Sequence, residues 1–150
     1  MDQPPTNARQ AVPFLGVTDL AASLRFYCDG LGFQVTNQWP DAGHPRWCWL
    51  QLGPVALMLQ EFTPPPQGKG RPEGTLGLGV NTCILCNDAL AIEREARARG
   101  LTAKEPFVGN GLWVVGYRDP DGYRIDFESP TDAPEETTLS QWLAQSGSRP

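Results

Sequence analysis

The regular pattern of hydrophobic and polar residues begins with an apolar stretch over 12–17, which predicts a strand. Four apolar residues then follow at intervals of four, three and four, as on one face of a helix: Leu20, Leu24, Tyr27 and Leu31. Asp19 stands directly before this face, where an aspartate is a typical N-cap, and Gly30 and Gly32 predict its end. The pattern therefore predicts a strand followed by a capped helix.

Three further strands are predicted in the first half, at 33–36, 47–52 and 55–62. The same order then recurs, with a strand at 80–86, a helix from Asp88 to Gly100, a short strand within 101–106, and strands at 112–118 and 123–128. Asp19 and Asp88 lie 69 positions apart, and so do Gly53 and Gly122. This common offset predicts an internal repeat of a β-α-β-β-β unit.

The repeat predicts an α+β fold in which two βαβββ modules form a cupped mixed sheet. We expect one domain over residues 1–130, with module one at 12–62, a Pro- and Gly-rich connector at 63–75 and module two at 76–130. The tail, 131–150, holds three apolar residues at helical spacing, Leu139, Trp142 and Leu143, so we expect a short helix there. This helix either packs on its own domain, which we favour, or covers a cleft or a partner subunit.

Composition excludes several classes of function. The chain has 150 residues, a net charge of −5 and only two lysines, so no basic surface is available for nucleic acid. It has neither the long apolar run of a membrane span nor a signal-peptide core, and we expect a cytoplasmic protein without a membrane partner. Its single histidine, His44, excludes a site with two imidazole ligands in one chain. Cys83 and Cys86 are expected to point to opposite faces of one strand, so they cannot bind one metal ion together. The four cysteines are expected to be reduced and mostly buried.

Two segments resemble a known family. Residues 17–33, VTDLAASLRFYCDGLGF, are similar to the first helix motif of the vicinal oxygen chelate superfamily, and 119–127, DPDGYRIDF, to its closing hairpin. The superfamily includes glyoxalase I, bleomycin-resistance proteins, fosfomycin-resistance enzymes and extradiol dioxygenases. The resemblance extends from about Val12 to Pro130 and implies the glyoxalase/bleomycin-resistance fold and a homodimer. It does not specify the reaction, because one fold hosts several chemistries and plain binding proteins.

The resemblance also implies where the metal-dependent members place their ligands. The first position corresponds to Val12, the second to Met58 with Gln60 two residues further on, the third to Asn81 and the fourth to Asp126. Only Asp126 is an anionic ligand, and Val12 has no donor atom, whereas zinc or iron sites use about three strong protein ligands. We therefore expect no catalytic metal, and the sequence identifies no catalytic residue.

Strand alternation predicts which side chains line the cleft. The tryptophans of 47–51 are expected to face the cleft, and Cys48 and Leu50 the helix. The expected ligand-binding residues are Phe14, Trp47, Trp49, Met58, Gln60, Asn81, Arg124 and Asp126. Two alternatives stay open: the tryptophans fill a core or a dimer interface, and Arg124 and Asp126 form a structural ion pair.

These observations favour a small-molecule-binding protein of the bleomycin-resistance type, and hence a role in antibiotic resistance, with an aromatic or cationic ligand and no catalytic metal. The alternative is a glyoxalase-like lyase or a dioxygenase with an altered ligand set, in which Gln60, Asn81, Asp126 and His44 converge. A third alternative is an interaction module that uses the cleft face only for dimerisation.

Overall fold

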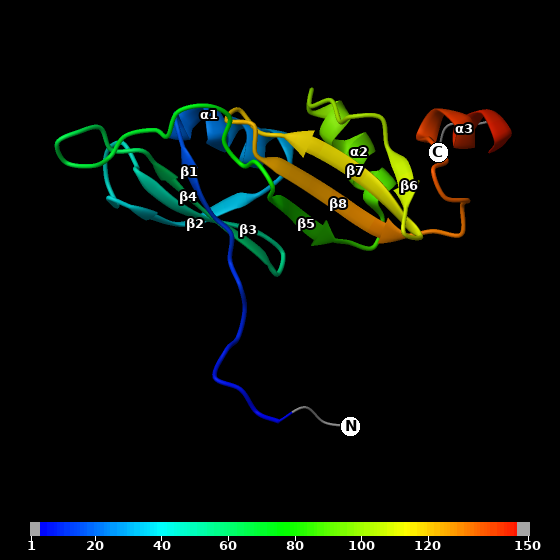
Figure 1. Cartoon of the computed structure of the whole chain (residues 1–150), viewed down its shortest axis with the longest axis horizontal. Coiled ribbons are helices and arrows are strands. Elements are labelled where there is room, and N and C mark those ends of the chain that lie inside the picture. The colour runs from blue at the N-terminus through cyan, green and yellow to red at the C-terminus, as the bar shows by residue number, and fades with distance from the viewer. Residues whose placement is uncertain (1–3, 147–150) are drawn as a thin grey trace.

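In the computed structural model, which describes residues 4–146, the chain forms two four-stranded sheets of equal topology (Figure 1). Sheet one contains β1 (Phe14–Val17), β2 (Gln34–Trp39), β3 (Trp47–Leu52) and β4 (Val55–Glu61), in the order β1-β4-β3-β2. Sheet two contains β5 (Asn81–Leu85), β6 (Phe107–Gly109), β7 (Leu112–Arg118) and β8 (Arg124–Pro130), in the order β5-β8-β7-β6. In each sheet the first strand runs parallel to the last and the other pairs are antiparallel. The predicted α+β fold and the repeated order of its elements are confirmed.

Aspartate side chains start both helices of the repeat, as the sequence predicts. The Asp19 carboxylate accepts from the Ala22 amide at 3.2 Å before α1 (Leu20–Leu24), and the Asp88 carboxylate accepts from the Ala91 amide at 3.0 Å before α2 (Ala89–Ala98). The first helix differs from the regular one expected, because it widens into a π-helical segment, η1 (Arg25–Gly30). Phe26 and Tyr27 on this segment are both buried, and their rings lie 4.8 Å apart.

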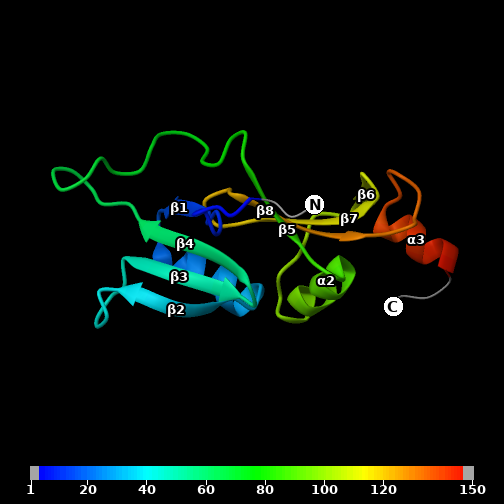
Figure 2. The same cartoon turned by 90° about the horizontal axis from the view of Figure 1, so that it is seen from below.

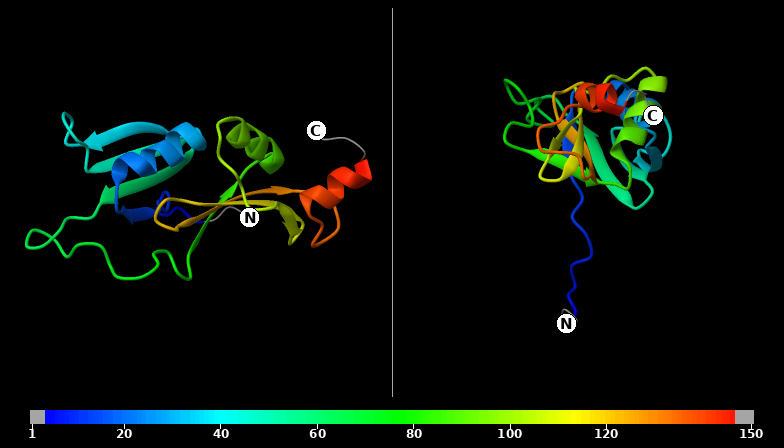
Figure 3. Two further views of the ribbon diagram at one scale, coloured as in Figure 1. Left: turned by 90° about the horizontal axis from the view of Figure 1, so that it is seen from above. Right: turned by 90° about the vertical axis from the view of Figure 1, so that its right-hand side faces the viewer.

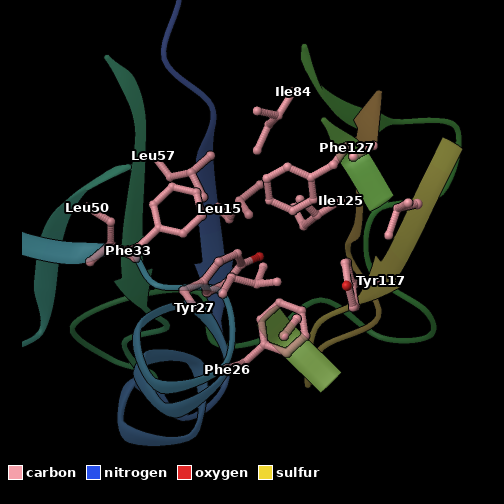
Figure 4. Packing of buried hydrophobic residues seen from close by; sticks show 14 of the residues in the cluster. Leu15, Phe26, Tyr27, Phe33, Leu50, Leu57, Ile84, Tyr117, Ile125 and Phe127 are labelled. Carbon is pink, nitrogen blue, oxygen red and sulfur yellow. The ribbon is translucent and has the colours of Figure 1, made fainter. Parts of the chain in front are cut away.

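The two modules share one hydrophobic core (Figure 4). Tyr27, Phe33 and Leu57 of module one point toward Ile125 and Phe127 of module two, and all five are buried. The helices lie on one side of the two sheets, while the segment that connects β4 to β5 runs along the opposite side (Figure 2). In the view from above, α1 lies in front of sheet one, and α2 lies beside sheet two, whose strands are seen nearly edge-on (Figure 3). One face of each sheet is therefore left without a helix.

Polar contacts also join the modules. The buried Tyr27 hydroxyl donates to the Asp119 carboxylate at 2.8 Å, across 92 positions of sequence. The Tyr123 hydroxyl donates to the backbone carbonyl of Gly16 at 2.8 Å. Asp119 and Tyr123 both lie in the turn between β7 and β8. This turn therefore holds module two against the first strand and helix of module one.

One predicted strand is wrong. Residues 101–106 form no strand, and the short strand lies instead at β6, just beyond them. The backbone of 101–106 still runs beside β7, since the Lys104 amide donates to the Gly116 carbonyl at 3.0 Å. Pro106, the last residue of this segment, has no amide hydrogen and cannot donate to a ladder.

The C-terminal tail contains the expected helix, α3 (Leu139–Ser146). Leu139 is buried in the core, and the Trp142 ring lies 6.1 Å from the Trp113 ring in an edge-to-face contact. The described part of this helix packs on its own chain, and residues 147–150 of the predicted tail lie outside the described residues. None of the described helices is long and apolar enough to cross a bilayer.

Candidate functional site

The face of sheet one that carries no helix, which we call the open face of sheet one, presents two rows of side chains across the strands. Strand pairing places Phe14 opposite Met58, and Met58 opposite Trp49. In the next row, Gly16 lies opposite Gln60, Gln60 opposite Trp47, and Trp47 opposite Trp39. Paired residues share a face of a sheet, so these neighbouring rows form one surface.

Five of the eight predicted ligand-binding residues lie together on this open face: Phe14, Trp47, Trp49, Met58 and Gln60. The predicted alternation along β3 also agrees with the structure, because Cys48 and Leu50 are fully buried in the core. Trp47 and Trp49 are half-buried and do not belong to the core cluster of the described residues. Their rings are therefore not used to fill the interior of the chain.

A cavity of about 430 Å³ opens beside these rows. Its lining combines Phe14, Gly16 and Gln60 with residues 67–70 of the connector. The Phe62 ring covers Gly16 so closely that a Cβ atom there would lie 2.4 Å from the ring. Any larger residue at position 16 would displace Phe62, so glycine allows the connector to fold over the end of the sheet.

The other three predicted residues lie on the open face of sheet two. Asn81 is paired with Arg124, and Asp126 lies between Cys83 and Gly116 on its two neighbouring strands. Asp126 is only 2% exposed, and its Oδ1 atom lies 3.1 Å from Nε of Arg124. The ion pair between Arg124 and Asp126, one of the two alternatives for these residues, is therefore present.

Within one chain, the eight predicted residues are thus divided between two sheets. A separate cavity of about 350 Å³ lies on sheet two and includes Arg124. Neither of these two cavities combines residues from both open faces. His44 is also remote from sheet two in its contacts: its Nε2 atom lies 3.5 Å from Glu61 at the end of β4.

The residues at the superfamily's metal-ligand positions do not fit a catalytic ion. Val12 has no donor atom, Met58 supplies a thioether and Asn81 an amide. The one carboxylate, Asp126, is already paired with Arg124. A structure with these four side chains lacks the three strong ligands that a catalytic zinc site uses.

A different set of donors, Cys83, Asp126 and Glu128, lies on β5 and β8 with its ligand atoms within 4.8 Å of one another. The expectation of mostly buried cysteines is wrong, because only Cys48 is buried and Cys83 is exposed. Partial desolvation still raises the pKa of the Cys83 thiol, and the negative charges of Glu128 and Asp126 raise it further. Without an ion the thiol is therefore protonated at neutral pH, and a metal bound here would have to displace that proton. We interpret this group as a protonated thiol beside two carboxylates.

Sequence reasoning missed several residues of the two open faces. Trp39 extends the row that contains Trp47 and is 65% exposed, but the loop signals of 39–45 concealed it. Lys69 and Lys104 line the two cavities, one each. They are the only lysines of the chain, and this rarity was the one available signal for them.

Comparisons with known proteins agree with this architecture. A family model described as "Glyoxalase/Bleomycin resistance protein/Dioxygenase superfamily" matches residues 9–127. A glyoxalase/bleomycin resistance protein from Catenulispora acidiphila is 26% identical, with a TM-score of 0.63, and the match covers 83% of this chain and 100% of the other. TioX from Micromonospora is 19% identical over the same shares, also with a TM-score of 0.63.

A third solved structure is a bleomycin-binding protein in complex with bleomycin. It is 22% identical with a TM-score of 0.60, and the match covers 83% of this chain and 100% of that one. At this identity the likeness concerns the fold. Comparison with curated proteins gives no match.

Proposed function

Because the chain belongs to the Glyoxalase/Bleomycin resistance protein/Dioxygenase superfamily, we propose that it is a small-molecule-binding protein that holds an aromatic or cationic ligand without a catalytic metal. The observation that carries this proposal is the open face of sheet one. It presents Trp39, Trp47 and Trp49 with Met58, and both tryptophans of β3 lie outside the core. Exposed aromatic faces bind planar rings by stacking and attract cations to their π systems.

The neighbouring polar groups suit a site that orients its ligand rather than a site that catalyses a reaction. Gln60 supplies an amide in the same row as Trp47, and Phe14 adds a second apolar edge. Small-molecule sites typically combine apolar bulk with a few such polar groups. The likeness to a bleomycin-binding protein is consistent with this role and with antibiotic resistance.

Titration of the intrinsic tryptophan fluorescence tests the proposal. We expect saturable quenching by ethidium, a planar cation, by 2-naphthylmethanol, a neutral ring, or by bleomycin. Stronger quenching by ethidium at low salt would indicate a cationic ligand, and equal quenching an aromatic one. No quenching by any of the three up to their solubility limits would refute the proposal.

Metal analysis distinguishes the metal-free binding protein from the alternative function, a metal-dependent lyase or dioxygenase. We expect protein purified without a chelator to contain far less than one equivalent of zinc, nickel, manganese or iron per chain. Stoichiometric metal that disappears in the Asp126→Asn variant but persists in Glu136→Gln, a change of an exposed acid outside the ligand set, would favour the enzyme instead.

We also propose a homodimer, as the family resemblance implies. Both β1 and β5 are edge strands of their sheets, and exposed apolar side chains lie on them or just before them: Phe14, Leu78, Val80 and Leu85. Such side chains are typical of interaction surfaces. Sedimentation equilibrium should give twice the 16.4 kDa chain mass, and Leu85→Glu should shift the population to monomer. A monomer at all concentrations up to the millimolar range would contradict this expectation.

A further inference from the structure

A crevice between the two modules lies on the side of the sheets that carries the helices. Its volume is about 460 Å³, within the range of small-ligand sites. The end of β3 and the start of β4 line it from module one, and β5 and α2 line it from module two. In Figure 2, the hairpin between β3 and β4 ends beside α2. Among the described residues, the crevice shares no lining residue with the two cavities on the open faces.

The walls of the crevice are mainly aliphatic. Six apolar residues of the shared core, or packed directly on it, line the crevice: Leu31, Leu52, Val55, Ile84, Ile92 and Phe127. No tryptophan of the described chain lines it. The crevice therefore suits an aliphatic body, in contrast to the aromatic surface on the open face of sheet one.

Two opposite charges lie at the rim of the crevice, on α2 and directly after it. Ile92, Glu95 and Arg99 are spaced by three and four residues, so they follow one stripe of this helix. Glu95 and Arg99 are exposed, and they are the only charged residues in the described lining. The crevice is therefore neutral overall but carries one carboxylate and one guanidinium group.

These two charges do not pair with each other. Glu93 and Arg97, at the same spacing on α2, form an ion pair at 3.0 Å. Glu95 and Arg99 form none within the described part of the chain. Instead, Nη1 of Arg99 donates to the Gly30 carbonyl of module one at 3.4 Å, and its Nε and Nη2 atoms have no hydrogen bond to the described residues. Both charged groups are therefore available to a ligand.

Gly32 makes room for the guanidinium group at the boundary between the modules. Its φ is +87°, and a Cβ atom there would lie 3.4 Å from Nη1 of Arg99. A larger residue would be strained in this backbone conformation and would crowd the guanidinium. Arg99 thus reaches across to module one, 69 positions earlier in the sequence, and lines the crevice between the modules.

From this combination we infer that the crevice binds an aliphatic α-amino acid such as leucine. The ligand carboxylate pairs with Arg99, its ammonium group pairs with Glu95, and its branched side chain lies between the aliphatic walls. A zwitterion matches a lining that carries both charges and no net charge. The site goes beyond the proposed aromatic site, because it lies on the other side of the sheets. Of the residues proposed for the dimer contact, it includes only Leu85.

An NMR titration with leucine and three analogues tests the inference. 4-Methylpentanoate lacks the ammonium group, 3-methylbutylamine lacks the carboxylate, and glycine keeps both charges without an aliphatic body. We expect leucine to shift the amides of Gly32, Asn87 and Glu95. It should bind about fivefold tighter than either single-charge analogue, since an exposed ion pair contributes at most a factor of this order. Glycine should bind more weakly still, because it buries no aliphatic surface.

Variants of exposed residues separate the charge effects from folding. In Glu95→Gln, leucine should bind no tighter than 4-methylpentanoate, and in Arg99→Gln no tighter than 3-methylbutylamine. Glu73→Gln in the connector and Arg25→Gln on η1 make the same charge changes outside the lining. Both controls should keep the wild-type preference for leucine.

Leucine binding no tighter than glycine, or no tighter than both single-charge analogues, would overturn the inference. The same holds for an absence of shifts up to the solubility limit of leucine, for shifts centred on either open face, and for an unchanged preference in Glu95→Gln. Leucine has no ring to stack on tryptophan, so these outcomes do not bear on the fluorescence titration. A failure of the aromatic site would appear only in that titration.

Discussion

Replacing Trp47 and Trp49 together by alanine should weaken the binding of a planar aromatic ligand roughly 100-fold or more. A tryptophan at the centre of a binding surface typically contributes about 2 kcal/mol, and two neighbours on one strand act on the same ring, so their effects do not simply add. Both side chains lie on the open face of sheet one and neither belongs to the core. Titration by isothermal calorimetry, with the ligand that quenches best in the wild type, gives the two affinities.

The fold should survive this change. Because the two rings are half-buried and lie outside the core, we expect the free energy of unfolding to fall far less than for a core tryptophan. Trp142→Phe is a suitable control, since Trp142 packs against Trp113 at the opposite end of the molecule and keeps an aromatic ring there. Wild-type affinity in the double alanine variant would place the ligand elsewhere and contradict the proposal.

The second large effect concerns stability. Asp119→Ala should lower the free energy of unfolding by about 3–4 kcal/mol. The Asp119 carboxylate accepts three hydrogen bonds, from the Tyr27 hydroxyl at 2.8 Å and from the amides of Asp121 and Tyr123 at 3.0 and 2.8 Å. Alanine would leave the buried Tyr27 hydroxyl without a partner and would release the turn between β7 and β8. Urea unfolding followed by circular dichroism measures the change.

Two milder variants divide this effect into its parts. Tyr27→Phe removes only the hydroxyl and leaves the turn intact, so we expect a loss of about 1 kcal/mol. Asp119→Asn keeps an acceptor oxygen for Tyr27 and should lie between the two. A loss below that of Tyr27→Phe in the alanine variant would show that the carboxylate does not stabilise the turn.

The stability contribution of Asp119 should also depend on pH. Burial raises the pKa of Asp119 above its ordinary value, although hydrogen bonds from Tyr27 and the turn amides oppose this. The folded state therefore holds its proton to higher pH than the unfolded state, and stability falls as the pH rises through the folded pKa. Asp119→Asn lacks this loss, so its deficit relative to the wild type should shrink between acidic and neutral pH.

The elements that local chemistry determines could be predicted from the sequence. The caps of both helices follow from aspartates before an apolar face, and the DPDG turn follows from proline and from Gly122, whose φ is +95°. The faces of β3 follow from its alternation, because Cys48 and Leu50 had to be buried together. These features depend on residues close in sequence.

Features that depend on distant residues could not be predicted. The π-helical turn at η1 brings Tyr27 to Asp119, which lies 92 positions away. The division of the eight predicted residues between two sheets depends on how the modules pack, and no pattern within one strand carries that information. Lys104 lines the cavity on sheet two from a coil beside β7, and no periodicity in that coil predicts the direction of its side chain.

The parallel pairing of the first and last strand in each module has a consequence for synthesis. During synthesis, β1 cannot form its backbone hydrogen bonds until β4, about 44 residues later, has been made, and β5 likewise depends on β8. The Tyr27 hydroxyl meets its acceptor only after Asp119 has emerged. Folding of the shared interior is thus a late event, and a nascent chain that stops before β8 exposes the apolar side of module one.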